Sequence, residues 1–120
     1  MPAVCTWFVA DGDLPPTSSG QLVSHEALCA LNTSEDDAAV DFTVFFEDRD
    51  PLSGFHFTCP AQRTVHVRLD TIQNRDGEVI PKGKPYALEI RSSIPIIVQH
   101  SRMDTSQAPL ALFTTMGFPG

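Results

Sequence analysis

The sequence of 120 residues lacks several features that would narrow its class. Its three cysteines, Cys5, Cys29 and Cys59, are odd in number and form no C-x-x-C pair, so neither a disulfide framework nor a ribbon-type zinc site is indicated. Residues 1–10 carry no basic leader, and we predict no signal peptide. The uncharged segment 107–120 is too short to cross a bilayer. Together these absences favour a cytoplasmic protein with reduced thiols.

Positive charge is scarce as well. Eight lysines and arginines stand against fifteen acidic residues, which gives a net charge of −7. An acidic chain repels phosphate backbones and anionic lipids, so nucleic acid and membrane surfaces are not favoured as partners. The acids concentrate between Glu35 and Asp50, where Arg49 is the single base. This segment is typical of a solvated face, or alternatively of an acidic surface that docks on a basic protein partner such as a membrane receptor.

Long helical patterns are also missing, and ten prolines argue for many turns. Apolar and polar residues alternate instead with the period of two that is typical of β-strands. Residues 11–21 have the composition of a loop. The predicted strands are Thr6–Ala10, His25–Leu31, Val40–Glu47, Phe55–Thr58, Gln62–Leu69, Tyr86–Ser92, Ile96–Met103 and Ala111–Met116. About eight short antiparallel strands predict a single all-β domain over residues 1–120, a β-sandwich of jelly-roll type. Residues 107–120 are either a closing strand or a mobile C-terminal segment.

The most informative stretch is residues 94–104, where an apolar run passes into ionisable side chains without a turn. A continuous strand places His100 and Arg102 on the same face as Ile96 and Val98. Ionisable groups on an apolar face need partners or a polar cavity. We therefore expect a buried polar network, a subunit interface that uses Arg–Asp pairing such as Arg102 with Asp104, or a cleft that presents donors to a polar small molecule.

A second polar face lies on the predicted strand Gln62–Leu69. Thr64, His66 and Arg68 alternate there with valines that we expect to face the core. We predict that this face and that of His100 close around one polar pocket. Trp7 could supply an aromatic platform for a ligand, although a single tryptophan more simply fills a core.

Catalysis is not predicted. The four histidines are scattered singly rather than at ligand spacing, so we expect no metal and no cofactor, with a cupin-like metal enzyme kept as an alternative. Ser24, His25 and Glu26 are neighbours along a strand and point to opposite faces, and no G-x-S-x-G elbow occurs.

Three extended motifs carry a resemblance to a known family. The segments 24–32 (SHEALCALN), 60–68 (PAQRTVHVR) and 93–104 (SIPIIVQHSRMD) resemble, in order and spacing, those of the sensory rhodopsin transducer family. Trp7, the Pro15-Pro16 loop and residues 106–112 are also similar. The chain departs from the family pattern in its acidic stretch, in residues 71–85 and after Met116.

The resemblance implies a small cytoplasmic jelly-roll-like sandwich that assembles as a homotetramer. It implies a non-catalytic signalling module, a soluble relay for a membrane photoreceptor or other receptor. Relatives resemble bacterial small-molecule-binding domains, with sugar-like ligands suggested. On that analogy the candidate ligand-binding residues are Trp7, His25, Glu26, Arg63, His66, Arg68, Gln99, His100 and Arg102.

Overall fold

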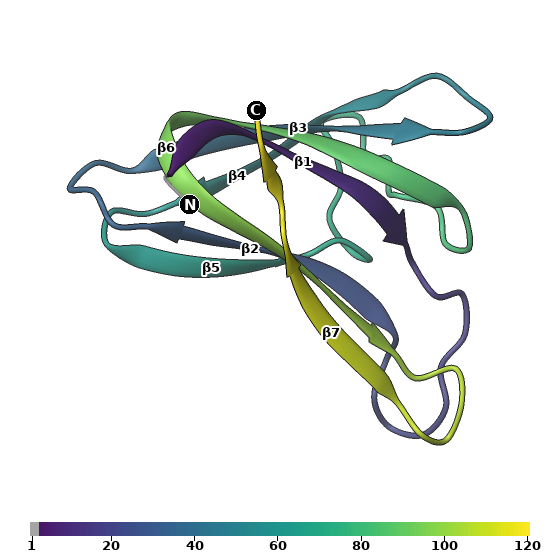
Figure 1. The fold of residues 1–120 in the computed structure, drawn as a ribbon. Helices are drawn as coiled ribbons and strands as arrows, with labels where there is room; N and C mark the ends of the chain where they lie inside the picture. Colours follow the sequence, from purple (N-terminus) through teal and green to yellow (C-terminus); the bar gives the residue numbers. More distant parts are fainter. Residues whose placement is uncertain (1–2) are drawn as a thin grey trace.

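The computed structural model describes residues 3–120 as an antiparallel all-β structure (Figure 1). Within these residues no helix is long and apolar enough to span a membrane. The strands are β1 (Val4–Asp13), β2 (His25–Asn32), β3 (Ala38–Phe46), β4 (Leu52–Cys59), β5 (Arg63–Arg68), β6 (Pro85–Asp104), β7 (Ala111–Met116) and β8 (Phe118–Pro119). The predicted all-β sandwich is therefore confirmed.

The 20-residue strand β6 organises the fold, because it belongs to both layers of the sandwich. Its first half pairs with β3 and β1, and its second half pairs with β2 and β7. We call the layer β4-β3-β6-β1-β8 sheet A and the layer β5-β2-β6-β7 sheet B. β1 and β7 follow one another along one edge of β6, and the gap between them opens where the two sheets diverge (Figure 1).

Two strand boundaries differ from the sequence prediction. The predicted strands Tyr86–Ser92 and Ile96–Met103 are one strand, because Pro95 falls between the ladders, where no strand partner needs its N–H. β1 continues to Asp13 through a shift in register after Val9, whereas residues 11–13 were predicted to be loop. Residues 111–116 form the predicted closing strand, with β8 added after them.

The core lies between the inward faces of the two sheets. Phe42 and Phe55 stack at its centre with ring centroids 4.9 Å apart, and Trp7 is fully buried beside them. Val65 and Val67 pack against this cluster from β5, as their alternation predicted. Along the second half of β6 the inward residues change from the apolar Val98 to the polar His100 and Arg102, and beside them β2, which runs in the opposite direction, has Glu26 before Leu28. This change of chemistry along the strands places the site at one end of the sandwich.

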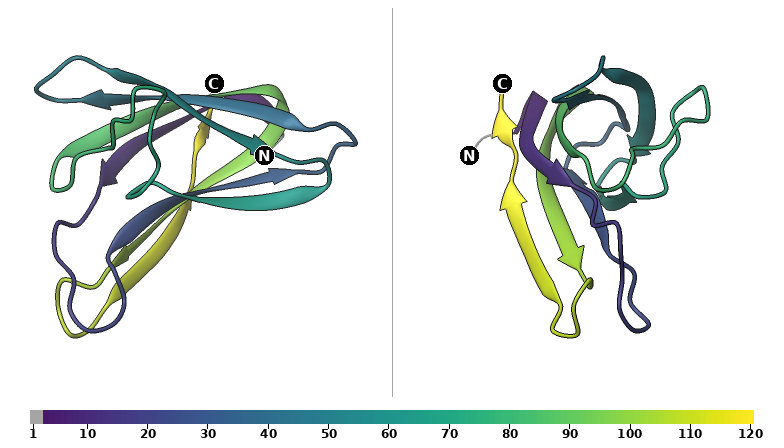
Figure 2. Two further views of the ribbon diagram at one scale, coloured as in Figure 1. Left: turned by 180° about the vertical axis from the view of Figure 1, so that it is seen from behind. Right: turned by 90° about the vertical axis from the view of Figure 1, so that its right-hand side faces the viewer.

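Two connections close that end of the sandwich. Residues 14–24 and 105–110 lie side by side in both views of Figure 2, and the Ser24 hydroxyl contacts the Thr105 hydroxyl at 3.0 Å. After β7 the chain turns at Gly117 and crosses the start of β1 as β8. A Cβ at Gly117 would lie 3.1 Å from the Trp7 ring, so a larger residue there would require the ring or the backbone to shift by a few tenths of an ångström.

Candidate functional site

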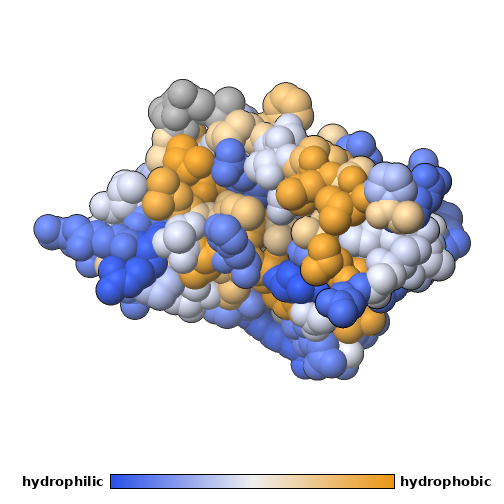
Figure 3. Space-filling model, turned by 90° about the horizontal axis from the view of Figure 1, so that it is seen from below, coloured by the Kyte–Doolittle hydropathy of each residue, from blue (hydrophilic) through white to orange (hydrophobic). Residues whose placement is uncertain are grey.

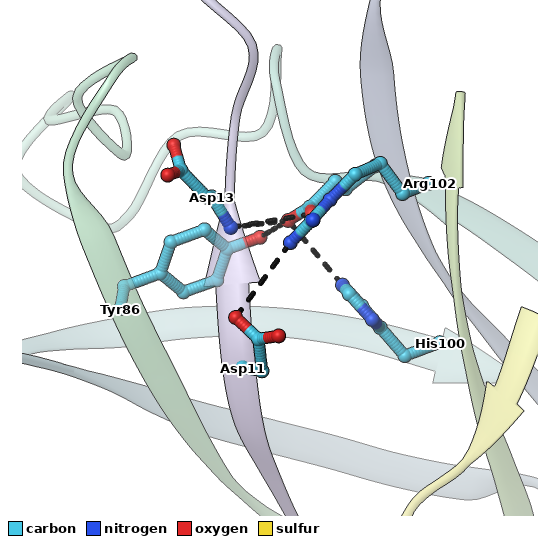
Figure 4. Close-up of polar contacts among 6 residues, drawn as sticks. Asp11, Asp13, Tyr86, His100 and Arg102 are labelled. Carbon is cyan, nitrogen blue, oxygen red and sulfur yellow. Dashed lines mark hydrogen bonds and ion pairs between the residues drawn. The ribbon is translucent and has the colours of Figure 1, made fainter. Parts of the chain in front are cut away.

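A buried carboxylate organises the polar end of the sandwich. The side chain of Glu26 is fully buried between the sheets and receives donors from two strands (Figure 4). The Tyr86 hydroxyl donates to Oε1, the Arg102 Nε donates to Oε2, and the backbone N–H of Asp13 lies 3.2 Å from both oxygens. His100 Nε2 is 3.3 Å from Oε1. We call Glu26, Tyr86, His100 and Arg102 the Glu26 hub.

The strand registers explain how these side chains meet. Glu26 in β2 is the direct cross-strand partner of Arg102 in β6, and His100 is two residues away on the same face. Tyr86 comes from the other half of β6, and its ring lies over Gly12, where a Cβ would overlap the ring atoms. Because β6 bends between the sheets, one strand supplies three of the four members of the hub.

The ionisation of the hub follows from its contacts. Burial opposes the charge on Glu26, but contacts with His100, Tyr86 and Arg102 outweigh burial and lower its pKa to about 2. Burial and the charge of Glu26 raise the pKa of Tyr86 well above its usual range. Burial disfavours the charge on Arg102, but the hydrogen bond to Glu26 raises the pKa of the guanidinium overall. At neutral pH the hub therefore holds an ionised Glu26 opposite a protonated tyrosine and a charged arginine.

Three nitrogen atoms of the hub remain without a hydrogen-bond partner among residues 3–120. They are Nδ1 and Nε2 of the fully buried His100 and Nη2 of Arg102. Arg102 Nη2 has the carboxylate of Asp11 at 3.8 Å, and the guanidinium lies 5.2 Å from the centre of the Phe113 ring. Buried polar groups in proteins are nearly always paired, so unpaired donors mark a place where a further polar group can bind.

A pocket of about 320 Å³ opens beside Arg102 at the end of the sandwich. Two hydroxyls, two carboxylates and two proline rings line it together with the guanidinium. We call it the end pocket; its lining residues are Asp13, Pro15, Pro16, Thr17, Arg102, Asp104 and Ser106. Ser106 donates its N–H and its hydroxyl to Oδ1 of Asp104, and these bonds lower the pKa of Asp104. The side chain of Asp13 points away from Glu26 (Figure 4), which leaves its carboxylate free for another donor.

The structure separates residues that were predicted to share a pocket. His66 and Gln99 lie on the outward face of sheet B, where they line a second hollow of about 450 Å³, the outer cavity, together with Thr64. His100 and Arg102 lie on the inward face of the same sheet. The interpretation that the polar faces of β5 and β6 close around one pocket is therefore wrong. β2 lies between β5 and β6 and keeps all three strands in one layer.

The other predicted site residues have local partners. Trp7 is fully buried and donates its N–H to the carbonyls of Val4 and Ile96, so its ring fills the core. The remaining three lie near the surface of sheet B. His25 contacts the Val23 carbonyl, Arg63 donates to the Gln62 carbonyl, and Arg68 makes two 2.8 Å bonds to Asp70.

Within the chain, Arg102 pairs with Glu26 and not with Asp104. Glu26 lies directly across the ladder and binds Arg102, while Asp104 bonds to Ser106. Tyr86, Asp11 and Asp13 are hub contacts that the list of candidate residues missed. The one sequence signal for them was a glutamate within the apolar strand β2, which requires donors from neighbouring strands. In the part of the chain that the structure describes, no three His, Cys, Asp or Glu side chains converge as a metal site.

Known proteins resemble this chain in both sequence and fold. The family model described as Anabaena sensory rhodopsin transducer matches residues 4–119. The crystal structure of Thermotoga maritima 1070 has a TM-score of 0.88 and 35% identity, over 100% of this chain and 97% of the other. The structure of the Anabaena sensory rhodopsin transducer has a TM-score of 0.73 and 38% identity, over 82% of this chain and 95% of the other.

A search of curated proteins found no match. The family match nevertheless spans nearly the whole chain, and both structural relatives share its fold at more than a third identity. The three motifs that first indicated the resemblance lie on β2, β5 and β6, the strands that form most of sheet B. On this ground the chain belongs to the Anabaena sensory rhodopsin transducer family.

Proposed function

We propose that this protein is a non-catalytic signalling module that binds a polar, carbohydrate-like small molecule in the end pocket and relays the bound state to a protein partner. The observation that carries the proposal is Arg102. Its Nε is bound to the buried Glu26, its Nη2 is buried without a hydrogen-bond partner among residues 3–120, and the residue lines the end pocket. A guanidinium held in this way is oriented before a ligand arrives.

The chemistry of the end pocket suits a polyhydroxylated ligand. The carboxylates of Asp13 and Asp104 accept hydrogen bonds from hydroxyl groups, and Arg102 donates to a ring or hydroxyl oxygen. Pro15 and Pro16 offer apolar surface to the C–H face of a sugar ring. An anionic ligand is disfavoured, because the charge of Arg102 is already balanced by Glu26 and two carboxylates line the wall.

The Glu26 hub supplies a route from the pocket to the rest of the fold. A ligand that binds Arg102 acts on the side chain that holds Glu26, and Glu26 in turn fixes β1 through the Asp13 N–H and the first half of β6 through Tyr86. A ligand shifts such an equilibrium by its difference in affinity for the two arrangements. The bound state would therefore be communicated as a change in the positions of β1 and β7 at the end of the sandwich that holds the Glu26 hub.

The test begins with a thermal-shift screen against neutral mono- and disaccharides, sugar acids and sugar phosphates, followed by calorimetric titration of each hit. A ligand that binds only the folded state raises the melting temperature by mass action. We expect neutral saccharides to raise it and Thr17→Val to weaken their binding about tenfold, the loss of one hydrogen bond.

Thr64→Val is the matched control, because Thr64 lines the outer cavity rather than the end pocket. It should leave the affinity unchanged. Arg102 itself is a poor test residue, because its loss leaves Glu26 as a buried charge and weakens the fold. Either a screen without any stabilising saccharide, or affinity that depends on Thr64 and not on Thr17, would contradict the proposed site.

The proposal includes a homotetramer in the cytoplasm. Supporting an assembly, the outward residues of β2, β5, β6 and β7 include one permanent charge, Arg68, which is paired with Asp70. Leu112 on this face is 62% exposed, and Figure 3 shows apolar side chains gathered across the lower side of the molecule. Supporting a reducing compartment, all three cysteines are free thiols. Sedimentation equilibrium of the purified protein tests the tetramer directly.

The receptor partner follows from the family. Its name describes a transducer of a sensory rhodopsin rather than an enzyme, and we propose a membrane photoreceptor or related receptor as the source or target of the signal. The acidic-face alternative has less support, since six of the seven acids fall into two groups at the opposite ends of β3, residues 35–37 and 47–50, with Asp41 alone between them. In the second group Arg49 and Lys84 already neutralise Asp48.

A further inference from the structure

A third hollow is lined by Asp11 and Phe113, two of the residues that Arg102 contacts. It is a groove of about 410 Å³ between β1 and β7, bordered by β8, and we call it the side groove. Most of its lining is apolar: Val9, Ala10, Phe113, Met116 and Phe118, with Thr115 and Asp11 completing it. Phe118 at its lip is 67% exposed. The groove follows from the path of the chain, because β8 pairs only with Trp7 and Phe8 and leaves the edge of β1 beyond them without a strand.

We propose that the side groove binds a short extended segment of a protein partner that carries an apolar side chain next to a lysine or arginine. The proposal rests on the proposed function only in assuming that the module signals to a protein. It adds where the partner binds and what chemistry the groove recognises.

The shape and backbone of the groove favour an extended segment. At the outer edge of β1, the Thr6 carbonyl accepts a hydrogen bond from the N–H of Gly120. Because alternate residues of a strand direct their backbone groups to the same edge, the carbonyls of Phe8 and Ala10 lie on this edge too. Phe8 is taken up by β8, whereas Ala10 is exposed. An incoming strand can pair with the backbone at Ala10 and place an alternate side chain against Val9 and Phe118.

The charge of Asp11 favours a basic residue next to the apolar residue of the partner segment. Asp11 is the one charged residue among those that line the groove, and its side chain is 89% exposed at the rim. Its nearest cation is Arg102 Nη2 at 3.8 Å, a separation too long for a hydrogen bond. A lysine or arginine on the partner therefore finds a carboxylate whose charge is only partly balanced, while an acidic segment is repelled by Asp11 and by the net charge of the chain.

Arg102 also joins the side groove to the end pocket. Its guanidinium contacts Asp11 and the Phe113 ring, which both line the side groove, and Arg102 is also a lining residue of the end pocket. A ligand that moves the Arg102 side chain toward the end pocket weakens its ion pair with Asp11 and its contact with the Phe113 ring. By linkage, a partner segment that binds Asp11 alters affinity in the end pocket by the same factor.

The experiment is a selection of phage-displayed random heptapeptides on the intact protein without any small ligand. Enriched peptides are then synthesised, and their affinities are measured by fluorescence anisotropy. We expect enrichment of peptides in which an apolar residue adjoins a lysine or arginine. Asp11→Asn should weaken their binding about twofold to fivefold, as for an exposed charge pair, and Phe118→Ser about tenfold through lost apolar contact.

Two matched variants lie away from the groove. Asp36→Asn removes an exposed acid from the turn before β3, and Phe45→Ser removes an exposed phenylalanine from sheet A; both should bind the selected peptides as the original chain does. Enriched peptides without a basic residue, or peptides indifferent to Phe118→Ser, would overturn the inference. So would a change of oligomeric state in Phe118→Ser by sedimentation velocity, because the groove would then belong to a contact between copies. A failed saccharide screen leaves this result unaffected, since no small ligand is used.

Discussion

Asn32 and Glu26 lie at opposite ends of β2, and both are fully buried between the sheets. The Asn32 amide donates to the carbonyls of Asp36, Cys59 and Pro60, and its oxygen accepts two bonds from Ser34. Every polar atom of Asn32 is thus paired, and all but one of the groups that it contacts belong to the backbone. Such a residue fixes the course of three chain segments.

Glu26 differs in charge, in the nature of its donors and in what surrounds it. Its donors are mainly side chains, and three nitrogen atoms of His100 and Arg102 lack hydrogen-bond partners within residues 3–120. Arg102 lines the end pocket, and its contacts Asp11 and Phe113 line the side groove, whereas Asn32 lines neither of these two hollows. The difference teaches that a buried polar residue indicates function when its network is incomplete and lies beside a cavity, rather than by being buried and polar alone.

The largest effect on stability is expected at Asn32, whose hydrogen bonds are all satisfied within the chain. Asn32→Ala removes five hydrogen bonds and leaves buried carbonyls unpaired, so the free energy of unfolding should fall by about 4 kcal/mol. Urea denaturation at pH 7 measures it. Saccharide affinity of the remaining folded protein should be unchanged, and a loss of affinity would show that Asn32 is more than a structural residue.

The next effect concerns the charge of Glu26. Its pKa of about 2 in the folded protein lies below its value of about 4.3 in an unfolded chain, so the ionised form stabilises the fold above the unfolded pKa. That stabilisation, about 3 kcal/mol, should be lost as the pH falls from about 5 to about 2.

Glu26→Gln removes this contribution. Urea denaturation at several pH values should therefore give a steep acid dependence for the original chain and a shallower one for Glu26→Gln. Equal slopes for the two proteins would mean that other carboxylates dominate acid unfolding. Asp50→Asn, at an exposed position, is the control and should keep the steep dependence.

A smaller effect is expected at Gly12. A methyl group there overlaps the Tyr86 ring, so Gly12→Ala should displace the ring from Glu26 and lower stability by about 2 kcal/mol. Tyr86→Phe removes the same hydroxyl contact without crowding. If stability losses of the two variants add in the double variant, the glycine does not act through the tyrosine; if they do not, it does.

The smallest effect is expected on the outward face of sheet B. His66 is exposed and lines the outer cavity, so His66→Ala should change the free energy of unfolding by less than about 0.5 kcal/mol. It should also leave saccharide binding unchanged. A saccharide that binds the original chain but not His66→Ala would place the ligand in the outer cavity and remove the functional contrast between Glu26 and Asn32.

Sequence patterns predicted the strands well because their apolar residues alternate. The same alternation correctly placed His100 and Arg102 on the face of Ile96 and Val98. Patterns along one strand could not say which strands are neighbours. His66 was therefore joined to His100 in a pocket, although β2 places them on opposite faces of one sheet.

Contacts between residues on strands that are distant in the chain could not be predicted from the sequence either. Asp11, Gly12 and Asp13 read as a loop, because glycine and aspartate are common in turns. In the fold they extend β1 past Tyr86 and bring the Asp13 N–H to Glu26. Only a register between strands distant in the chain creates that contact, and no local propensity encodes it.

The continuity of β6 has a consequence for how the protein unfolds. Because one unbroken strand carries ladders to β1, β2, β3 and β7, neither layer can lose its order without breaking pairings that the other layer needs. The two sheets are therefore a single cooperative unit, and amide protons in their centres should exchange at one common rate, set by global unfolding. If the proposed relay acts through small shifts at one end, this cooperativity keeps the two sheets together while it does so.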